Sequence, residues 1–488
     1  MIAPADPALA LAVPAVGAVA IAAAGRWPNL REAFTLATAG LLFTACAGLL
    51  PAVLAGDRPQ TTLLEMFPGL ALMLRVEPLG MLFALVASGL WIVNSIYSIG
   101  YMRANREAHQ TRFYICFAIA LASTMGIAFA GNLLTLFLFY EALTLSTYPL
   151  VTHHGTAEAR RAGRVYLGLL LGTSIGLLLL AIAWTWWLAG TLEFRPGGIL
   201  DGKADAAVGV ALLVLYMFGI GKAALMPLHR WLPAAMVAPT PVSALLHAVA
   251  VVKAGVFSVV KVIVYVFGVE RLSGVEAGAW LPAVAGITIV LASVIALRAD
   301  DLKRRLAYST VSQLSYVVLA AALLAPLSLV GAALHIAAHA VSKITLFFAA
   351  GAIYTAAHKT KVSELDGIGR RMPFTMGAFT VGALSLIGVP PLAGFVSKWH
   401  IVAGAVAAGK PAAVAVLVAS TLLNAAYFLP IVYAAYFKAP PQQQQPAHGE
   451  APASILLALG LSALLTVGLF VVTDLPLQLA RQLMATSG

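Results

Sequence analysis

Charged side chains interrupt several long apolar stretches of this sequence. One is an acid, Glu141, and five are lysines: Lys222, Lys253, Lys261, Lys343 and Lys398. A lysine at the centre of a bilayer costs about 2.5 to 3.5 kcal/mol on insertion scales, so five lysines facing lipid would cost on the order of 15 kcal/mol. We therefore expect these groups to face one another, Glu141 or internal water, where amines and carboxylates can exchange protons.

Histidines accompany the lysines. His335, His339 and Lys343 are spaced at i, i+4 and i+8, which places them in one stripe along a helix. Three titratable groups at membrane depth favour a polar path for protons, and His247 lies in an earlier apolar stretch. The spacing of His335 and His339 also suits zinc, but the nearby lysines and the single interior acid argue against a cation site. We predict no bound metal.

Other side chains have a structural interpretation. Lys261 lies nearer the end of its apolar stretch, so its ammonium group can instead reach the membrane interface. His153 and His154 precede a basic run and are expected in a solvated loop, where replacement of His153 should do little. Three tryptophans near one end of a span are typical of interfacial anchors: Trp184, Trp186 and Trp187.

Two apolar segments contain helix breakers near their middles. Residues 219–233 and 388–399 carry both glycine and proline. Proline removes a backbone donor, and freed backbone groups at membrane depth are tolerated only against protein or water. Paired broken helices in two halves of a chain are typical of repeated transporter architecture. We predict two discontinuous helices lining a hydrated interior, with Lys222 and Lys398 near the breaks; two proline-kinked structural helices are the alternative.

The elements that hold these side chains must be membrane-spanning helices. Of 488 residues, 61% are hydrophobic and 10% charged, whereas soluble proteins carry about 25% charged residues. This composition and a mean hydropathy of +0.93 exclude a water-soluble fold. The net charge of +11 is therefore interpreted by its location, not as binding of nucleic acid. Cys46 and Cys116 both lie in apolar stretches, so no disulfide framework, cysteine-ligated cluster or cofactor is expected.

At about 20 residues per spanning helix, the sequence predicts fourteen spans. We place them at residues 8–25, 33–55, 78–101, 113–130, 132–152, 165–190, 206–238, 240–267, 279–297, 306–325, 327–357, 373–409, 411–437 and 453–473. The first lacks a basic leader and is taken as a span, not a cleaved signal peptide. Residues 440–446, rich in proline and glutamine, are expected to form a flexible cytoplasmic connection.

Lysine and arginine are unevenly shared between alternate connections. Seventeen fall on one side, and the other side has seven: Arg58, Arg75, Arg195, Lys203, Arg271, Lys410 and Arg481. Because short cytoplasmic loops are enriched in these residues, both termini are predicted to lie outside the cytoplasm.

Several motifs recur in a fixed order along the chain. They are Phe139-Tyr-Glu141-Ala-Leu with Pro149, Lys222 with 227–233, 238–247 leading to 252–255, His335 to Lys343, and 388–394 before Lys398. The set resembles the antiporter-like proton-translocating subunits shared by respiratory complex I, Mrp-type multisubunit sodium/proton antiporters and membrane-bound hydrogenases. The resemblance covers nearly the whole chain.

This resemblance implies an all-α polytopic membrane fold. A three-helix segment, 1–110, would precede two inverted five-helix repeats, 111–268 and 277–438, each with a discontinuous helix, and a polar linker and last helix would occupy 439–488. Glu141 and Lys222 would be the paired acid and base of the first half-channel. Lys253 would be the central relay, supported by His247 and His229. His335, His339 and Lys343 would extend the path to Lys398, the terminal group of the second half.

Lys398 also separates subfamilies, since one complex I type looks to have glutamate there. Lys398 and the short segment after the fourteenth span make the sequence most similar to the D-type subunit of Mrp antiporters and its hydrogenase-type relatives. The smallest complex I antiporter-like subunit is the second most similar. The expected function is proton translocation in the plasma membrane, with other membrane subunits as partners and sodium as a candidate counter-ion.

Two further hypotheses are a stand-alone carrier of an organic solute and an enzyme with its own quinone chemistry. If the chain is a proton-translocating subunit, as we expect, it needs no catalytic site of its own, although it could serve in a redox-driven oxidoreductase. For an assumed Glu141–Lys222 separation of about 7 Å and an effective dielectric of about 20, their attraction is about 2.4 kcal/mol. Moving one charge across 100 mV costs about 2.3 kcal/mol. An external driver must therefore supply the remainder.

Overall fold

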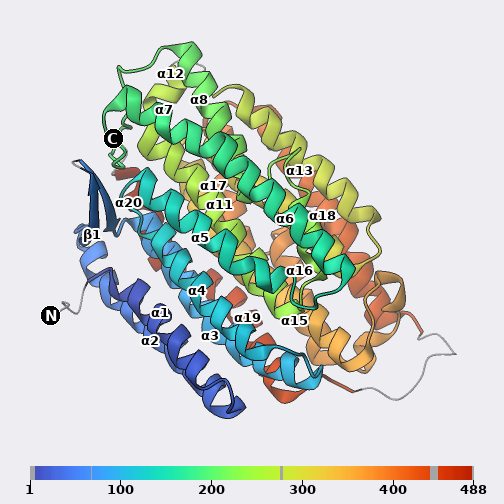
Figure 1. Cartoon of the computed structure of the whole chain (residues 1–488). Helices are drawn as coiled ribbons and strands as arrows, with labels where there is room; N and C mark the ends of the chain where they lie inside the picture. The colour runs from blue at the N-terminus through green and yellow to red at the C-terminus, as the bar shows by residue number, and fades with distance from the viewer. Residues whose placement is uncertain (1–5, 68, 275–277, 440–448, 486–488) are drawn as a thin grey trace.

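The computed structural model describes residues 6–67, 69–274, 278–439 and 449–485, and these are almost entirely helical (Figure 1). The predicted all-α membrane fold is confirmed, with one exception. Strands β1 (Gln60–Phe67) and β2 (Leu70–Arg75) form an antiparallel hairpin. Long apolar stretches do not predict it, because this connection is short and mixed in character.

The helices run in chain order through the whole described chain. They are α1 (Leu9–Ala23), α2 (Pro28–Leu54), α3 (Pro78–Ala104), α4 (Gln110–Ala128), α5 (Leu133–Val151), α6 (Ala157–Thr173), α7 (Leu179–Ala189), α8 (Ala206–Gly219), α9 (Trp231–Ala234), α10 (Thr240–Val242), α11 (Val251–Lys261), α12 (Val269–Gly274), α13 (Trp280–Arg298), α14 (Leu302–Ala322), α15 (Pro326–Ala357), α16 (Pro373–Ile387), α17 (Ala393–Ala407), α18 (Pro411–Phe437), α19 (Ala453–Val471) and α20 (Asp474–Ala485). One short π-helical stretch joins α6 to α7, a second joins α10 to α11, and a third follows α11.

Ten described helical segments are long and apolar enough to cross a membrane, and α1, α8 and α16 are shorter apolar helices. α14 completes the fourteen predicted segments although it is rich in polar side chains. Nearly all of α14 is buried, including Ser309, Ser312 and Gln313. A helix enclosed by other helices does not have to be apolar all round, because its polar groups never meet lipid. The amphipathic α20 follows the last span.

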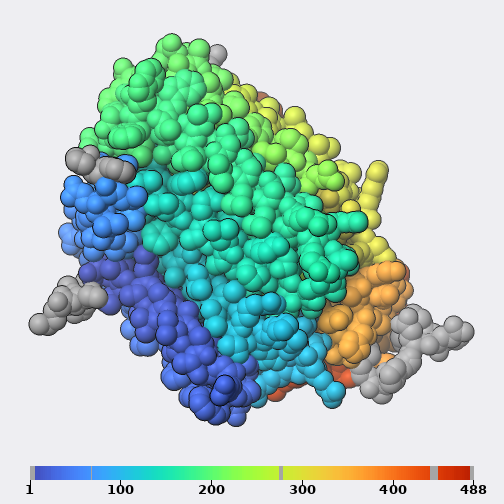
Figure 2. Space-filling view, in the orientation of Figure 1, coloured from blue at the N-terminus to red at the C-terminus, as the bar shows by residue number. Residues whose placement is uncertain are grey.

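The core of the bundle is built around α15 and the segment 240–267, whose most apolar stretches are completely buried. α15 packs against α3, α14, α16, α17, α19 and α20. Chain from α1 to α8, blue through green, covers the face turned to the viewer in Figure 2. Exposed apolar side chains on these helices, such as Trp187 of α7 and Leu145 of α5, are suited to lipid or to another apolar partner.

Both predicted helix breaks are present. α8 ends at Gly219, and a 3-10 turn at Gly221–Ala223 holds Lys222. The indole of Trp231 donates to the carbonyl of Gly221 at 2.9 Å, which satisfies a backbone group freed by the break. A Cβ at position 255 would lie 2.3 Å from the Lys222 carbonyl carbon, so only glycine lets α11 approach this turn.

The second break separates α16 from α17. Gly388 follows α16 with φ +97°, a backbone conformation that favours glycine. The chain resumes as a helix at Ala393 and carries Lys398 in its second turn. In the first predicted repeat and in the second, the broken helix is the fourth segment. The division into repeats at 111–268 and 277–438 stays a prediction.

The bundle has two distinct ends. The hairpin face carries β1, β2 and the ends of α12 and α20, and α1 begins there (Figure 1). The loop face, at the opposite end, carries loops 105–109, 152–156, 299–301 and 358–372, with Asp301 bridging to Lys361. Both described ends of the chain therefore lie on the hairpin face. The proposed flexible connection at 440–446 lies outside the described residues.

Candidate functional site

Lys222 is completely buried at the first break. Its ammonium donates to the Tyr140 carbonyl at 2.7 Å and to the Thr144 hydroxyl at 2.6 Å, and it lies 3.1 Å from the centroid of the Tyr140 ring. The Tyr140 hydroxyl also accepts the Lys222 backbone N–H at 3.0 Å. α5 thus holds the lysine entirely through neutral groups.

Glu141, the predicted acid partner, lies one residue further along α5. Both of its carboxylate oxygens are buried and have no hydrogen-bond partner among the described residues. An electrostatic interaction couples it to Lys222, yet the two form no ion pair within 4 Å in the described chain. Glu141 therefore influences the lysine without holding it in a direct contact.

Lys253, on α11, reaches across to α15. Its Nζ lies 2.5 Å from Nδ1 of His339, and both residues are fully buried. His339 Nε2 has no partner among the described residues. The predicted central relay and one member of the predicted histidine stripe are therefore in direct contact.

The stripe of α15 continues on either side of His339. His335 Nδ1 lies 2.9 Å from the Ser397 hydroxyl on α17, and its ring stacks on Tyr316 at 5.5 Å. On the other side, Lys343 donates to Ser309 at 2.8 Å. The predicted single stripe is thus present, and its members contact α11, α14 and α17.

Lys398 binds the end of the broken helix. Its ammonium donates to the carbonyls of Leu386 at 2.7 Å and Ile387 at 3.1 Å, the last residues of α16, and lies 4.9 Å from the Tyr316 ring centroid. A cation at these carbonyls is stabilised by the negative end of the helix dipole. His335 lies within electrostatic range of both Lys253 and Lys398, which links the predicted central relay to the terminal lysine of the second half.

His247 and His229 lie apart from both groups of lysines. Both ring nitrogens of His247 are buried without a partner among the described residues, and its ring is 6.0 Å from Trp231. His229 lies 6.0 Å from the ring of Tyr308. The structure places them between the first break and the loop face, without a direct bond to any path lysine.

Lys261 corrects a sequence-based interpretation. Its ammonium does not extend into solvent, because it is fully buried and lies 3.0 Å from Glu77 Oε2. It also donates to the Ala130 carbonyl at 2.6 Å and lies over the Phe194 ring. Glu77 was missed because it directly precedes the predicted span 78–101. A search one turn beyond each predicted span would have found it.

His153 corrects another. It is 3% exposed, not solvated, and packs edge-on against Phe113. Burial lowers the pKa of His153 to about 4, although the Glu107 carboxylate 3.7 Å away opposes this effect. His154, the more exposed of the two, is the histidine that meets water. No group of three or more His, Cys, Asp or Glu in the described chain could hold a metal ion.

Residues 130–424 match the family model described as "NADH:quinone oxidoreductase/Mrp antiporter, TM", and this range includes every predicted path residue. Among curated relatives, "NADH-quinone oxidoreductase subunit N" of Desulforudis audaxviator is 37% identical over 75% of this chain and 73% of its own length. A probable K(+)/H(+) antiporter subunit of Rhizobium meliloti is 32% identical over 75% of this chain but only 36% of its own length.

Two solved structures share the fold. A chain of the Mrp complex from Dietzia sp. DQ12-45-1b superposes with a TM-score of 0.87 at 22% identity, covering 99% of this chain and 97% of that one. A chain of the membrane-bound sulfane sulfur reductase, an archaeal respiratory membrane complex, superposes with a TM-score of 0.86 at 24% identity and the same coverage. At these identities the likeness establishes the architecture.

Proposed function

Because the chain belongs to the NADH:quinone oxidoreductase/Mrp antiporter family, we propose that it is a proton-translocating subunit of a multisubunit membrane complex. The observation that carries this proposal is the 2.5 Å contact between Lys253 and His339. Two buried groups that exchange protons meet there from separate helices, near the middle of a chain of similar groups.

The proton step at this contact follows from the geometry. A charged Lys253 passes a proton to Nδ1 of His339, which leaves a neutral amine and an imidazolium. The imidazolium then releases the proton on Nε2 to internal water, for which this unpartnered nitrogen is a suitable donor. Lys253 is recharged from the Glu141–Lys222 side, and Lys343 or Lys398 receives the proton beyond His339. Their mutual repulsion makes these groups titrate together.

Neighbouring subunits must drive the cycle. Moving one charge against 100 mV requires about 2.3 kcal/mol, so the cycle needs an energy source. We propose a monovalent cation/proton antiporter most like the Mrp subunit of the D type, with sodium as a candidate counter-ion. The 37% identity to a subunit N over 73% of that relative favours a redox-driven complex as the second candidate.

The excess of lysine and arginine on the loop face supports an orientation in the plasma membrane. We propose that the loop face is cytoplasmic and that both termini lie outside, because short cytoplasmic loops are enriched in these residues.

The test uses the complex purified with this chain and reconstituted into liposomes. Lys253→Met should reduce proton transport to background, because it removes the exchanging amine. Lys410→Met, which replaces an exposed lysine on the hairpin face, should retain the wild-type rate. Normal transport by Lys253→Met would overturn the proposal, and proton flux that requires an added organic solute would favour the carrier hypothesis.

The same preparation separates the two assemblies. Proton transport driven by a sodium or potassium gradient indicates the antiporter, whereas transport driven by an electron donor indicates the redox complex. Mass spectrometry of the co-purified subunits gives an independent answer. An absorbance or redox signal belonging to this chain alone would support the quinone-enzyme hypothesis instead.

A further inference from the structure

The loop face contains a cavity of about 670 Å³. Its inner wall includes Thr240, at the start of the buried segment 240–267, and Tyr308 of α14, whose ring lies 6.0 Å from His229. Its outer wall includes Glu107 and His154. The cavity therefore extends from the loops towards the histidines beside the first break.

Glu107 and His154 form a pair at the outer wall. His154 Nε2 lies 3.3 Å from each carboxylate oxygen of Glu107. The side chain of His154 is 38% exposed and that of Glu107 13%, so the pair is in reach of water while its carboxylate is partly enclosed. Hydrogen bonding to Glu107 raises the pKa of His154 above its ordinary value, towards the range in which histidine exchanges protons under physiological conditions.

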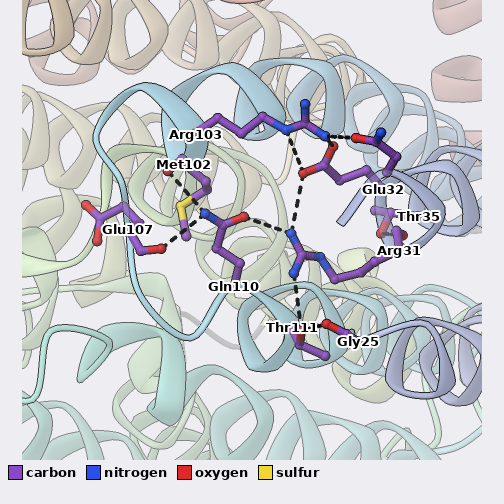
Figure 3. A network of polar contacts seen from close by, with 10 residues as sticks. Gly25, Arg31, Glu32, Thr35, Met102, Arg103, Glu107, Gln110 and Thr111 are labelled. Carbon is purple, nitrogen blue, oxygen red and sulfur yellow. Dashed lines mark hydrogen bonds and ion pairs between the residues drawn. The ribbon is translucent and has the colours of Figure 1, made fainter. Parts of the chain in front are cut away.

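A polar network fixes the loop that carries Glu107 (Figure 3). Gln110 donates to the carbonyls of Glu107 at 3.1 Å and Met102 at 3.3 Å, and Arg31 donates to Gln110 Oε1 at 2.8 Å. Arg31 also interacts with Glu32, which Arg103 binds from α3. Three helices thus determine where this exposed loop presents its carboxylate.

The loop is also strained. Arg106 and His109, on either side of Glu107, have φ of +50° and +51°. Such conformations are strained for residues other than glycine and concentrate at functional sites. The network of Arg31 and Gln110 holds the loop in this conformation.

The inner end of the cavity approaches His247. Lys303, a lining residue, donates to the Ala238 carbonyl at 2.6 Å and lies within electrostatic range of His247. Both ring nitrogens of His247 are buried and unpartnered among the described residues. A buried imidazole in this state needs a polar partner, and water entering from the cavity would provide one.

We propose that Glu107 and His154 are the proton-collecting pair of this subunit, and that the cavity is the vestibule leading from the loop face to His247. The carboxylate or the imidazole accepts a proton from hydronium, leaving water, and passes it to vestibule water further in, which restores the pair. This inference rests on the proposed function and adds the place where protons enter or leave the loop face.

Other charged groups face this pair and set its proton affinity. On the acidic side are Glu158 and Asp301. On the basic side are Arg112 and His153 behind the pair and Lys303, Lys359, Arg161, Arg230 and Arg304 around the cavity. The basic groups repel hydronium, so a carboxylate–imidazole pair at the mouth has a specific use: it provides a local site where protons are held.

The test measures how transport depends on the pH at each face. The double variant Glu107→Gln with His154→Gln is compared with wild type in vesicles of defined orientation. At a loop-face pH of about 8.5, where hydronium is scarce, collection limits the rate and the variant should be about tenfold slower. At a pH of about 6.5 it should be within about twofold, because hydronium is more abundant there and collection no longer limits the rate. Changing the pH at the hairpin face should not alter the ratio.

Asp366→Asn is the matched control, because Asp366 is a partly exposed acid of the loop face that pairs with Lys438 at 3.4 Å, away from the cavity. It should keep the wild-type pH profile. If the double variant does not assemble, His154→Gln alone, at the more exposed position, should show a smaller loss in the same direction. An unchanged profile, or an equal loss at every pH, would overturn the inference.

Lys253→Met is measured in parallel to separate this inference from the proposed function. If Lys253→Met still transports protons, the proposed function fails. If it is inactive and the mouth variants have the wild-type profile, the path stands and only the entrance is wrong.

Discussion

Lys253 and Lys261 lie eight residues apart on the same helix, α11, and both are completely buried, yet they are held in opposite ways. Lys261 lies 3.0 Å from the carboxylate of Glu77. Lys253 lies 2.5 Å from a neutral acceptor, His339. The other buried lysines of the predicted path resemble Lys253, because their hydrogen-bond acceptors are hydroxyls and backbone carbonyls.

This difference predicts which buried lysines can exchange protons. A carboxylate at contact distance stabilises the charged amine and is itself stabilised, so the pair holds its proton. A neutral acceptor stabilises the charged amine less than a carboxylate does. When the amine loses its proton, no unpaired charge remains buried beside it. The same residue type in the same helix can therefore support a fixed contact at one end and proton transfer at the other.

The largest effect is expected when the neutral partner of Lys253 is replaced by a carboxylate. At about 3 Å and an effective dielectric of about 20, His339→Glu would attract the ammonium by about 5 kcal/mol. We expect proton transport by the reconstituted complex to fall to background. His339→Gln is the control. It also removes the proton-relaying imidazole, so transport should fall, but without a carboxylate to hold the ammonium charged it should retain some transport through internal water. Equal rates for the two variants would contradict the role assigned to neutral partners.

The second prediction concerns the fixed pair. Glu77→Gln leaves Lys261 buried without its counter-charge, which should lower the free energy of unfolding by about 3 to 5 kcal/mol. Thermal unfolding of the purified complex, followed by intrinsic fluorescence, measures this loss. The double variant Glu77→Gln with Lys261→Met should recover much of the stability and transport at the wild-type rate. Loss of transport in the stable double variant would place this pair in the proton path.

The smallest effect is expected for His153, which is intermediate between the two lysines. A carboxylate lies 3.7 Å away, but its effect on the pKa of His153 is smaller than that of burial. Its pKa of about 4 lies below the unfolded value of about 6.5. Its neutral form therefore supports the fold fully above pH 6.5, and this support is lost as the pH falls towards 4. At pH 5 the loss should be about 1 kcal/mol after solvent screening.

His153→Phe should be less sensitive to acid than wild type, because it cannot take up a proton and can still pack against Phe113. Thermal unfolding at pH 7 and pH 5 gives the comparison. An identical acid shift in both proteins would show that His153 does not titrate in this range.

The sequence predicts best those features that depend only on residues close together in the chain. The broken helices were predicted from Gly and Pro, and the buried lysines from their position in apolar stretches. The contact between Glu77 and Lys261 joins residues 184 positions apart in the sequence. The periodicity of a single helix cannot predict which distant residues come into contact. The pairing of Glu141 with Lys222 stays a prediction: Glu141 interacts electrostatically with Lys222, while the ammonium donates its hydrogen bonds to Tyr140 and Thr144.

The interpretation of His153 failed for a related reason. A basic run after a predicted span indicates a loop, and loops are usually solvated. Whether one of two adjacent histidines turns inward depends on the neighbouring helices, here through Phe113 and Glu107. Seven of the nine predicted path residues lie in two local groups, one around Lys222 and one around His339, while His229 and His247 bond to neither within the described chain. Their role in proton transfer stays a prediction.

The polar composition of α14 has a consequence for biosynthesis. A nascent segment that leaves the ribosome with this many hydroxyl, amide and cationic side chains gains little by partitioning into lipid alone. Its neighbour α13 is strongly apolar and packs extensively along it. The two are therefore expected to leave the translocon together as a helical hairpin, so that α14 is shielded by protein before it is committed to the bilayer.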